Sequence, residues 1–349
     1  MSLTAPTLTE LTPKAAMPGG ELLIQGSGLG SGPGADLTIT VSGEAARVTL
    51  SRPSQIRVQI PEGVFDGEVI AECNGQRSNG LTARIAVPMA ENLHPVTNPA
   101  VDEQGNVYTT LSGSRGQQLP VSVFRIPPAP DGQTHQLQPF VRDLLNPSGL
   151  AFSREGDLYV SSRADGIVYR IDSQGQAVVF AEGLGIATGI AFDEAGDLYV
   201  GDRSGTIFKV RMAGAGRGQE TFVFATLEPS IAFYHLAFDS KGVLYVTGPT
   251  TSSSQSIQAI DRDGTARVFF RGLGRAQGMA FDVDDNLYVA ASYAGDRGIV
   301  RITPEGAAKL VVSGPNLVGL CFLPDARLAL ATREAVYELV FGVQGRPLI

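Results

Sequence analysis

The stretch FDEAGDLYVG at residues 192–201 decides the fold, because the chain contains six versions of it. The others are VDEQGNVYTT at 101–110, FSREGDLYVS at 152–161, FDSKGVLYVT at 238–247, FDVDDNLYVA at 281–290 and the weaker FLPDARLALA at 322–331. Successive versions are 40 to 51 residues apart. A β-rich repeat of this length is typical of a propeller, so six versions predict six blades around a central channel.

The sequence around the second version predicts the four strands of one blade. An inner strand at 148–152 is followed by strands at 157–162 and 166–172 and by an outer strand at 177–184, with Gly, Asp and Ser in the turns between them. Because each strand reverses direction, the loop before the inner strand and the loop between the second and third strands share one face. We call this the mouth face. The opposite face holds the repeated turns, such as 193–196, and we call it the turn face.

Two positions of the repeat are predicted to be structural. The first is the repeated acid of the turn, which we expect to accept hydrogen bonds from its own backbone; it is Asp102, Asp193, Asp239 and Asp282. The second is the repeated aromatic residue, which we expect to pack between blades; it is Tyr108, Tyr159, Tyr199, Tyr245 and Tyr288. In the sixth version Ala329 takes the tyrosine's place.

Residues 1–88 lack the repeat and contain short alternating runs between turn residues, which predicts a β-sandwich. The predicted fold is therefore all-β, with a small immunoglobulin-like β-sandwich at 1–88 followed by a six-bladed β-propeller at 92–349. Blade six lacks an outer strand, since only GRPLI follows its third strand at 335–343. We expect residues near 82–92 to supply that strand and close the ring, which removes an open sheet edge.

Both parts resemble known families. The first resembles the IPT/TIG family of immunoglobulin-like domains through Pro6, Leu11, Pro13, Gly19-Gly20, Ile24, Gly26 and PEGVFDGEVIAECNGQRSN at 61–79. Such domains are usually spacers or binding modules, so this resemblance implies no chemistry. The repeats resemble NHL-type repeats and the senescence-marker-protein/gluconolactonase superfamily, which are both six-bladed. That resemblance is specific for the fold and nearly silent about function.

The amino-acid composition limits the classes of partner that the protein is expected to bind. The 349 residues have 27 Lys and Arg against 35 Asp and Glu, a net charge of −8, which argues against nucleic acid and against an anionic membrane surface. No apolar run reaches the roughly 18 residues of a membrane helix. The first residues show no leader pattern, which favours a cytoplasmic protein, although a removed leader would leave the same sequence. Cys73 and Cys321 have no metal-type spacing and are expected to be buried thiols.

The residues that enter the inner strands are the first candidates for a site. They are Thr97-Asn98, Ser148-Gly149, Thr188-Gly189, Tyr234-His235, Gln277-Gly278 and Val318-Gly319. Four blades have Gly where blade four has His235, which is therefore a candidate base or metal ligand. The alternative is a channel histidine that a neighbouring hydrogen bond satisfies.

Three arginines of the mouth loops, Arg163, Arg203 and Arg333, stand four residues after the tyrosine position of their blades. If they converge, they suit a carboxylate or phosphate ligand; the alternative is local pairing with nearby acids. The same loops carry Tyr293 and Arg297. The predicted ligand-binding residues are Asn98, Arg163, Arg203, Tyr234, His235, Gln277, Tyr293 and Arg333.

Two functions remain open. The gluconolactonase resemblance implies a divalent cation held by Glu, Asn and Asp at the channel mouth. Asn98 is the one amide of the expected type at the inner-strand entrances, which hold no carboxylate. No metal or other cofactor is therefore expected, and no catalytic residues can be assigned. The leading hypothesis is a soluble binding protein for a small, anionic ligand or a protein partner. The alternative is a divergent sugar-lactone hydrolase, which would need the cation.

Overall fold

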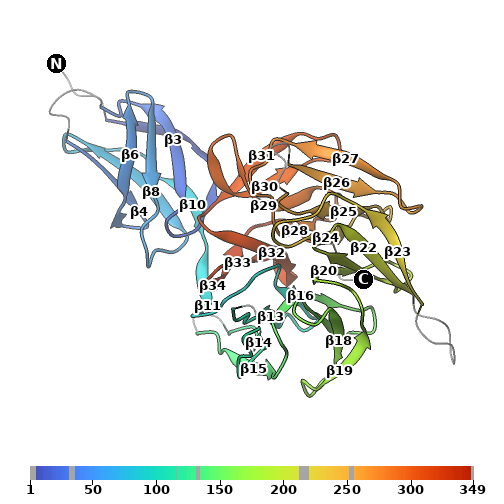
Figure 1. The fold of residues 1–349 in the computed structure, drawn as a ribbon. Helices are drawn as coiled ribbons and strands as arrows, with labels where there is room; N and C mark the ends of the chain where they lie inside the picture. The colour runs from blue at the N-terminus through green and yellow to red at the C-terminus, as the bar shows by residue number, and fades with distance from the viewer. Residues whose placement is uncertain are drawn as a thin grey trace.

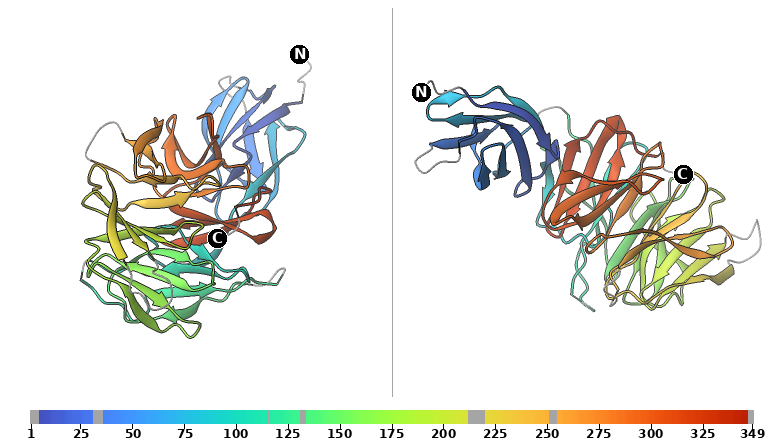
Figure 2. Two further views of the ribbon diagram at one scale, coloured as in Figure 1. Left: turned by 90° about the vertical axis from the view of Figure 1, so that its right-hand side faces the viewer. Right: turned by 90° about the horizontal axis from the view of Figure 1, so that it is seen from above.

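The computed structural model describes residues 5–30, 36–114, 116–130, 134–211, 220–250 and 255–346. It is an all-β structure in which a sandwich projects from the side of a six-bladed propeller, so the predicted fold class is confirmed (Figures 1 and 2). No helix in the described ranges is long and apolar enough to cross a membrane.

Each of the first five blades is built from four consecutive strands. They are β12 (Ala100–Val101), β13 (Val107–Thr110), β14 (Val123–Ile126) and β15 (Gln138–Val141) in blade one; β16 (Pro147–Phe152), β17 (Leu158–Ser162), β18 (Ile167–Ile171) and β19 (Ala177–Ala181) in blade two; β20 (Ala187–Phe192), β21 (Leu198–Asp202), β22 (Thr206–Arg211) and β23 (Glu220–Thr226) in blade three; β24 (His235–Phe238), β25 (Leu244–Thr247), β26 (Ser256–Ile260) and β27 (Ala266–Arg271) in blade four; and β28 (Met279–Phe281), β29 (Leu287–Tyr293), β30 (Asp296–Ile302) and β31 (Ala308–Ser313) in blade five.

Blade six is completed by a strand from before blade one. Its inner strands are β32 (Leu317–Leu323), β33 (Arg327–Thr332) and β34 (Ala335–Val340), with a short 3-10 turn, η1 (Pro324–Ala326), after β32. Strand β11 (Val87–Glu91) pairs antiparallel with β34 and becomes its outer strand. The predicted closure of the ring by the two ends of the propeller is therefore confirmed.

The sandwich has its own apolar core. One sheet consists of β1 (Thr7–Thr12), β3 (Glu21–Ser27), β7 (Gln55–Gln59) and β6 (Arg47–Arg52); the other contains β10 (Leu81–Ile85), β8 (Gly67–Cys73), β4 (Leu37–Val41), β5 (Glu44–Ala45) and β9 (Gln76–Arg77). Alternate residues such as Leu22, Ile24 and Ile39 point inward and are fully buried. Both cysteines are buried and free, as expected.

A short strand that the sequence did not predict, β2 (Ala15–Ala16), joins the sandwich to blade five. It pairs in parallel with β10 on one side and with β31 on the other, so one sheet runs from the propeller into the sandwich. The Met17 N–H also donates to the Ser313 carbonyl oxygen at 2.8 Å. The pairing covers the outer edge of blade five, whose backbone groups would otherwise lack strand partners.

The repeated turn acids have the predicted structural role. In blade three, one carboxylate oxygen of Asp193 accepts the N–H groups of Ala195 and Asp197, each at 3.0 Å, and the other accepts the Tyr199 hydroxyl at 3.1 Å. The same two backbone bonds recur at Asp102, Asp239 and Asp282. The turn face is therefore held by local hydrogen bonds.

The repeated tyrosines join neighbouring blades, as predicted. The Tyr199 ring meets Phe224 of its own outer strand and Phe238 of the next inner strand edge-on, with ring centroids 4.9 and 5.0 Å apart. Tyr108, Tyr159 and Tyr245 are each placed between two phenylalanines in the same way. Tyr288 lies between Phe322 of the next inner strand and Phe341, which follows β34. At Ala329 the ring closes through aliphatic packing that includes Val101 and Val107.

Two blades lack the turn carboxylate, and in blade six Leu323 takes its position. Ser153 takes the position of the acid in blade two, and its buried hydroxyl oxygen has no hydrogen-bond partner among the described residues. The backbone turn itself is kept, because the Ser153 N–H still donates to the Asp157 carbonyl oxygen at 2.9 Å. Blade two therefore keeps the turn of the repeat without the carboxylate.

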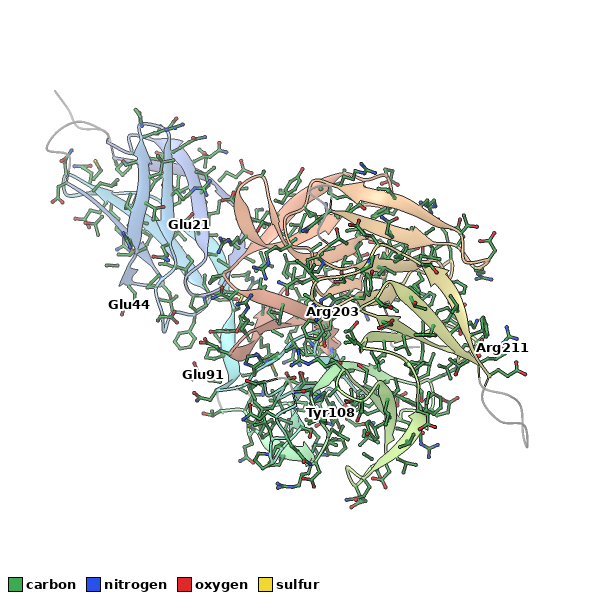
Figure 3. The ribbon with its side chains drawn as sticks, in the orientation of Figure 1. Glu21, Glu44, Glu91, Tyr108, Arg203 and Arg211 are labelled. Carbon is green, nitrogen blue, oxygen red and sulfur yellow. The ribbon has the colours of Figure 1, made fainter. Side chains whose placement is uncertain are left out.

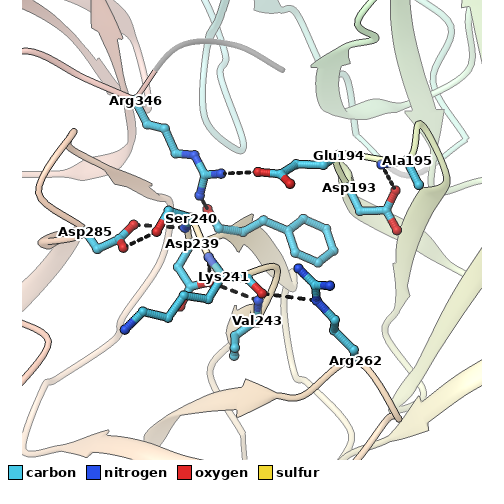
Figure 4. A network of polar contacts seen from close by, with 11 residues as sticks. Asp193, Glu194, Ala195, Asp239, Ser240, Lys241, Val243, Arg262, Asp285 and Arg346 are labelled. Atoms are coloured by element: carbon cyan, nitrogen blue, oxygen red, sulfur yellow. Dashed lines mark hydrogen bonds and ion pairs between the residues drawn. The ribbon is translucent and has the colours of Figure 1, made fainter.

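The C-terminal segment 341–346 crosses the turn face. The Arg346 N–H donates to the Phe281 carbonyl oxygen of blade five at 3.0 Å. The Arg346 guanidinium donates to the Phe238 carbonyl oxygen of blade four at 3.3 Å and to Glu194 of blade three at 3.0 Å (Figure 4). This segment therefore links three blades on the face opposite the predicted site.

Candidate functional site

The inner strands approach one another closely at the channel. A Cβ atom at Gly189 would lie 2.3 Å from the Tyr234 carbonyl oxygen, and one at Gly278 would lie 2.0 Å from Oδ1 of Asn98. No side chain fits at such distances. The glycines at the inner-strand entrances are therefore required by close packing around the axis.

Asn98 uses its amide to connect blades across this channel. Its Nδ2 donates to the Met279 carbonyl oxygen of blade five at 2.8 Å, and its Oδ1 accepts the Leu320 N–H of blade six at 3.1 Å. Both ends of the amide thus bind protein backbone. The structure gives Asn98 a role in the ring itself.

His235 is enclosed at the start of β24. Its residue is only 3% exposed, and no hydrogen-bond partner for its imidazole is found in the described part of the chain. Burial lowers the pKa of His235 from 6.5 to about 3. The imidazole is therefore neutral near pH 7, and so low a pKa makes it a weak general base.

The other predicted residues at the inner-strand entrances and mouth loops are mostly used in packing. The Tyr234 hydroxyl donates to the Glu228 carbonyl oxygen, and burial raises its pKa to about 12. The Gln277 Nε2 donates to the Leu317 carbonyl oxygen of blade six at 3.1 Å. Tyr293 is half-buried and packs on the core between blades four and five.

The structure does not bring Arg163, Arg203 and Arg333 into one pocket. Arg163 donates to the Gly113 carbonyl oxygen at 3.1 Å and lies over the Phe233 ring, 5.3 Å from its centroid. Arg203 lies near the middle of the propeller and donates through Nε to the Ser230 carbonyl oxygen at 3.2 Å (Figure 3). Because the three arginines stand equally far along the chain from the tyrosine position, their backbones occupy equivalent places in their blades. Their side chains, however, contact different local neighbours.

Arg333 instead meets two other arginines in a pocket of about 140 Å³ between blades five and six. The residues that line it are Gly274, Arg275, Gln277, Ala291, Ser292, Arg297, Gly298, Gly314, Asn316, Leu317 and Arg333. No acid is among them. Across the described ranges, Arg275, Arg297 and Arg333 have no ion-pair partner. The pocket therefore combines three exposed positive charges with amide and hydroxyl groups.

The strands of blade five explain how this pocket forms. Ser292 on β29 pairs with Arg297 on β30, and Gly274 exchanges two backbone hydrogen bonds of 2.8 Å with Ser292. These bonds hold the loop with Arg275 beside the end of the hairpin. Sequence reasoning placed Arg297 in a mouth loop but missed Arg275, which occupies no repeated position. The sequence feature that could have indicated Arg275 is its position two residues before Gln277, which enters the inner strand of blade five.

The set of residues at the channel mouth does not fit the cation that the gluconolactonase resemblance implies. A hard divalent cation prefers several carboxylate or carbonyl oxygens, but the inner-strand entrances hold no carboxylate and the amide of Asn98 is already bonded to backbone. In the described ranges no three His, Cys, Asp or Glu side chains are grouped as metal ligands would be. No reaction step through a metal follows from this geometry.

A family comparison identifies the sandwich. The model of the IPT/TIG domain matches residues 6–85, the region whose core and sheets are described above. Residues 6–85 form an IPT/TIG domain. No curated protein matches the chain by sequence.

Solved structures resemble most or nearly all of the chain at low identity. An auxiliary nutrient binding protein from Bacteroides thetaiotaomicron has a TM-score of 0.56 at 11% identity, over 96% of this chain and 97% of its own. One from Bacteroides ovatus has a TM-score of 0.54 at 10% identity, over 96% and 98%. A gluconolactonase from Xanthomonas campestris has a TM-score of 0.57 at 16% identity, over 74% and 89%. At these identities the likeness shows the fold alone.

A groove between the IPT/TIG domain and blade six adjoins the arginine pocket. It has a volume of about 570 Å³ and shares Asn316 and Arg333 with that pocket. The full lining is Met17, Pro18, Gly19, Glu62, Glu91, Asn92, Leu93, Pro315, Asn316, Thr332, Arg333, Glu334, Ala335 and Tyr337. The IPT/TIG domain thus forms one wall of a cavity beside the mouth face.

Proposed function

We propose that this protein binds a small anionic ligand on the mouth face, in the pocket lined by Arg275, Arg297 and Arg333. The observation that carries the proposal is that three arginines line one pocket with no carboxylate in its lining. A guanidinium group presents N–H donors in a planar fork that matches a carboxylate or a phosphate. Like charges that line one small pocket repel one another, and an anion relieves that repulsion.

The solved relatives are consistent with binding as the general role. Two of the structures that cover nearly the whole chain are described as auxiliary nutrient binding proteins. Their low identity carries no ligand over to this chain. The choice of an anion therefore rests on the residues of the pocket alone.

Titration calorimetry of the whole protein with inorganic phosphate, gluconate and glucose 6-phosphate at low salt tests the proposal. At least one anion should bind, and R297Q and R333Q should each weaken it about tenfold or more, because a hydrogen bond to a charged group contributes about 1.5–3 kcal/mol. The matched control is R203Q, which removes a mouth-face arginine outside the pocket. Absence of any binding, or equal binding by R297Q and R333Q, would contradict the proposal.

The second candidate, a sugar-lactone hydrolase, is favoured only by the shared fold of the gluconolactonases. A panel of sugar lactones tested with added Ca²⁺, Mg²⁺ or Zn²⁺ separates the two. Lactone hydrolysis that stops with a chelator would establish the hydrolase. Anion binding without hydrolysis supports the binding protein.

A further inference from the structure

The groove and the arginine pocket have opposite charge. Three carboxylates from different segments line the groove: Glu62 follows β7, Glu91 ends β11, and Glu334 is in the turn before β34. None of the three has an ion-pair partner in the described part of the chain. Among the described residues, no ion pair therefore joins the arginines of the pocket to the acids of the groove, although Arg333 and Glu334 are consecutive residues.

Tyr337 adds an aromatic ring to the acidic groove. It lies on β34 and is half-buried. Burial raises the pKa of the Tyr337 phenol, and the charges of Glu62, Glu91 and Glu334 raise it further, so all three carboxylates act on this ring. An aromatic face together with carboxylates is a favourable environment for an organic ammonium group.

The two cavities adjoin, because Asn316 and Arg333 line both. The pocket of about 140 Å³ has room for one charged group, while the groove of about 570 Å³ is within the usual range for small-molecule sites. A ligand whose anionic end is held in the pocket would therefore extend toward the carboxylates.

We propose that the ligand is an extended zwitterion, such as a short peptide, with its carboxylate at Arg275, Arg297 and Arg333 and its ammonium group among Glu62, Glu91 and Glu334. This inference rests on the proposed function, because it uses the same arginine pocket for the anionic end. It adds a second recognition element, built jointly by the IPT/TIG domain and blade six. The IPT/TIG domain then contributes directly to specificity through Glu62.

Calorimetry with diglycine, triglycine and tetraglycine, each compared with its N-acetyl form, tests the two-ended mode. Acetylation removes the ammonium charge and keeps the carboxylate. An exposed ion pair changes affinity by up to about fivefold, so the best free peptide should bind up to about fivefold more tightly than its acetylated form. Extended peptides lengthen by about 3.5 Å per residue, so the series also identifies the length that fits.

The double variant E62Q/E91Q should reduce the preference for the free amine to about twofold or less, by weakening the free peptide alone. R297Q should weaken both forms. The control is E44Q/E72Q, which removes the same charge from exposed positions of the IPT/TIG domain outside the groove and should keep the preference.

The outcomes distinguish this inference from the proposed function. Equal binding of free and acetylated peptides would overturn the zwitterion and leave the arginine pocket in place. A preference for the free amine that persists in E62Q/E91Q would also overturn it. Failure of every peptide and of every simple anion to bind would overturn both.

Discussion

On the turn face, Asp193 binds two backbone N–H groups and the Tyr199 hydroxyl of its own blade, whereas on the mouth face Arg297 and Arg333 have no ion-pair partner among the described residues. The turn face repeats one hydrogen-bond pattern in four of the six blades. The mouth face carries different side chains in each blade. The repeated turn acids thus stabilise the ring, whereas the arginines that line the pocket keep their charges available for a ligand.

The largest effect is expected where repeated rings join blades. Tyr288 is 1% exposed and packs edge-on against Phe322 and Phe341. Y288A should lower the free energy of unfolding by about 4 kcal/mol, as large-to-small changes in a core do. Y288F should cost about 1 kcal/mol, since only the hydrogen bond to Asp282 is lost. Urea denaturation measures both, and equal losses would contradict the packing role.

D193A tests the hydrogen bonds of the turn face. It leaves two N–H groups and the Tyr199 hydroxyl without their acceptor, and it removes one of the two ion pairs of Lys209. We expect a loss of about 3 kcal/mol in the free energy of unfolding. Thermal unfolding followed by circular dichroism provides the measurement. A loss below about 1 kcal/mol would mean that water replaces the carboxylate.

On the mouth face, His235 should make the free energy of unfolding depend on pH. Its pKa is about 3 in the folded state against 6.5 ordinarily, so between these values the unfolded state binds a proton that the folded state does not. Its contribution is present above pH 6.5 and falls as the pH drops toward 3. Between pH 7 and pH 5, wild type should lose about 2 kcal/mol more stability than H235Q. Parallel pH profiles in urea denaturation would contradict the buried neutral imidazole.

Ser153 allows the repeat to be restored in one step. S153D supplies the carboxylate that the turns of blades one, three, four and five contain, and Arg170 of the same blade already pairs with Asp157. The free energy of unfolding should rise by about 1 kcal/mol. S153A should have almost no effect, because the hydroxyl it removes has no partner among the described residues. Chemical denaturation of both variants decides, and a destabilised S153D would show that blade two cannot hold the carboxylate.

The smallest stability effect is expected in the arginine pocket. R297Q and R333Q change exposed side chains and should alter the free energy of unfolding by less than about 0.5 kcal/mol, while anion binding falls. Thermal melts without ligand provide the check. A large loss of stability would show that these arginines belong to the structural part of the molecule.

The sequence predicted the fold because six near-copies of one phrase support each other. The strand expected at 157–162 is found at Leu158–Ser162, and the missing outer strand of blade six was found before blade one because a propeller leaves only that position open. Strand β2 was not predicted, because Ala15-Ala16 has no strand pattern of its own. Its conformation is imposed by the two strands that flank it.

The candidate site was harder to predict, since side-chain directions are not repeated. The predicted residues Gln277 and Arg333 do line the arginine pocket, but Arg163 and Arg203 turn toward local carbonyl groups. Arg275 comes from a loop that repeat alignment ignores. The arginines that line one pocket are determined by the hairpin of blade five and by the adjoining part of blade six. The quasi-symmetry of the repeats could therefore predict which face carries the site, but not which residues form the pocket.

Because β11 pairs with β34, the propeller can be regarded as a circular permutation of a chain with six consecutive four-stranded blades. Val87 of β11 lies opposite Glu338 of β34, so the end of one strand and the start of the other are neighbours. If a tight turn joined Val340 to Val87, the propeller would be a closed sequence of six whole blades. In that description the IPT/TIG domain is an insertion into the last hairpin of blade six. A chain opened between two other blades would then carry this domain as an internal module, still beside the arginine pocket.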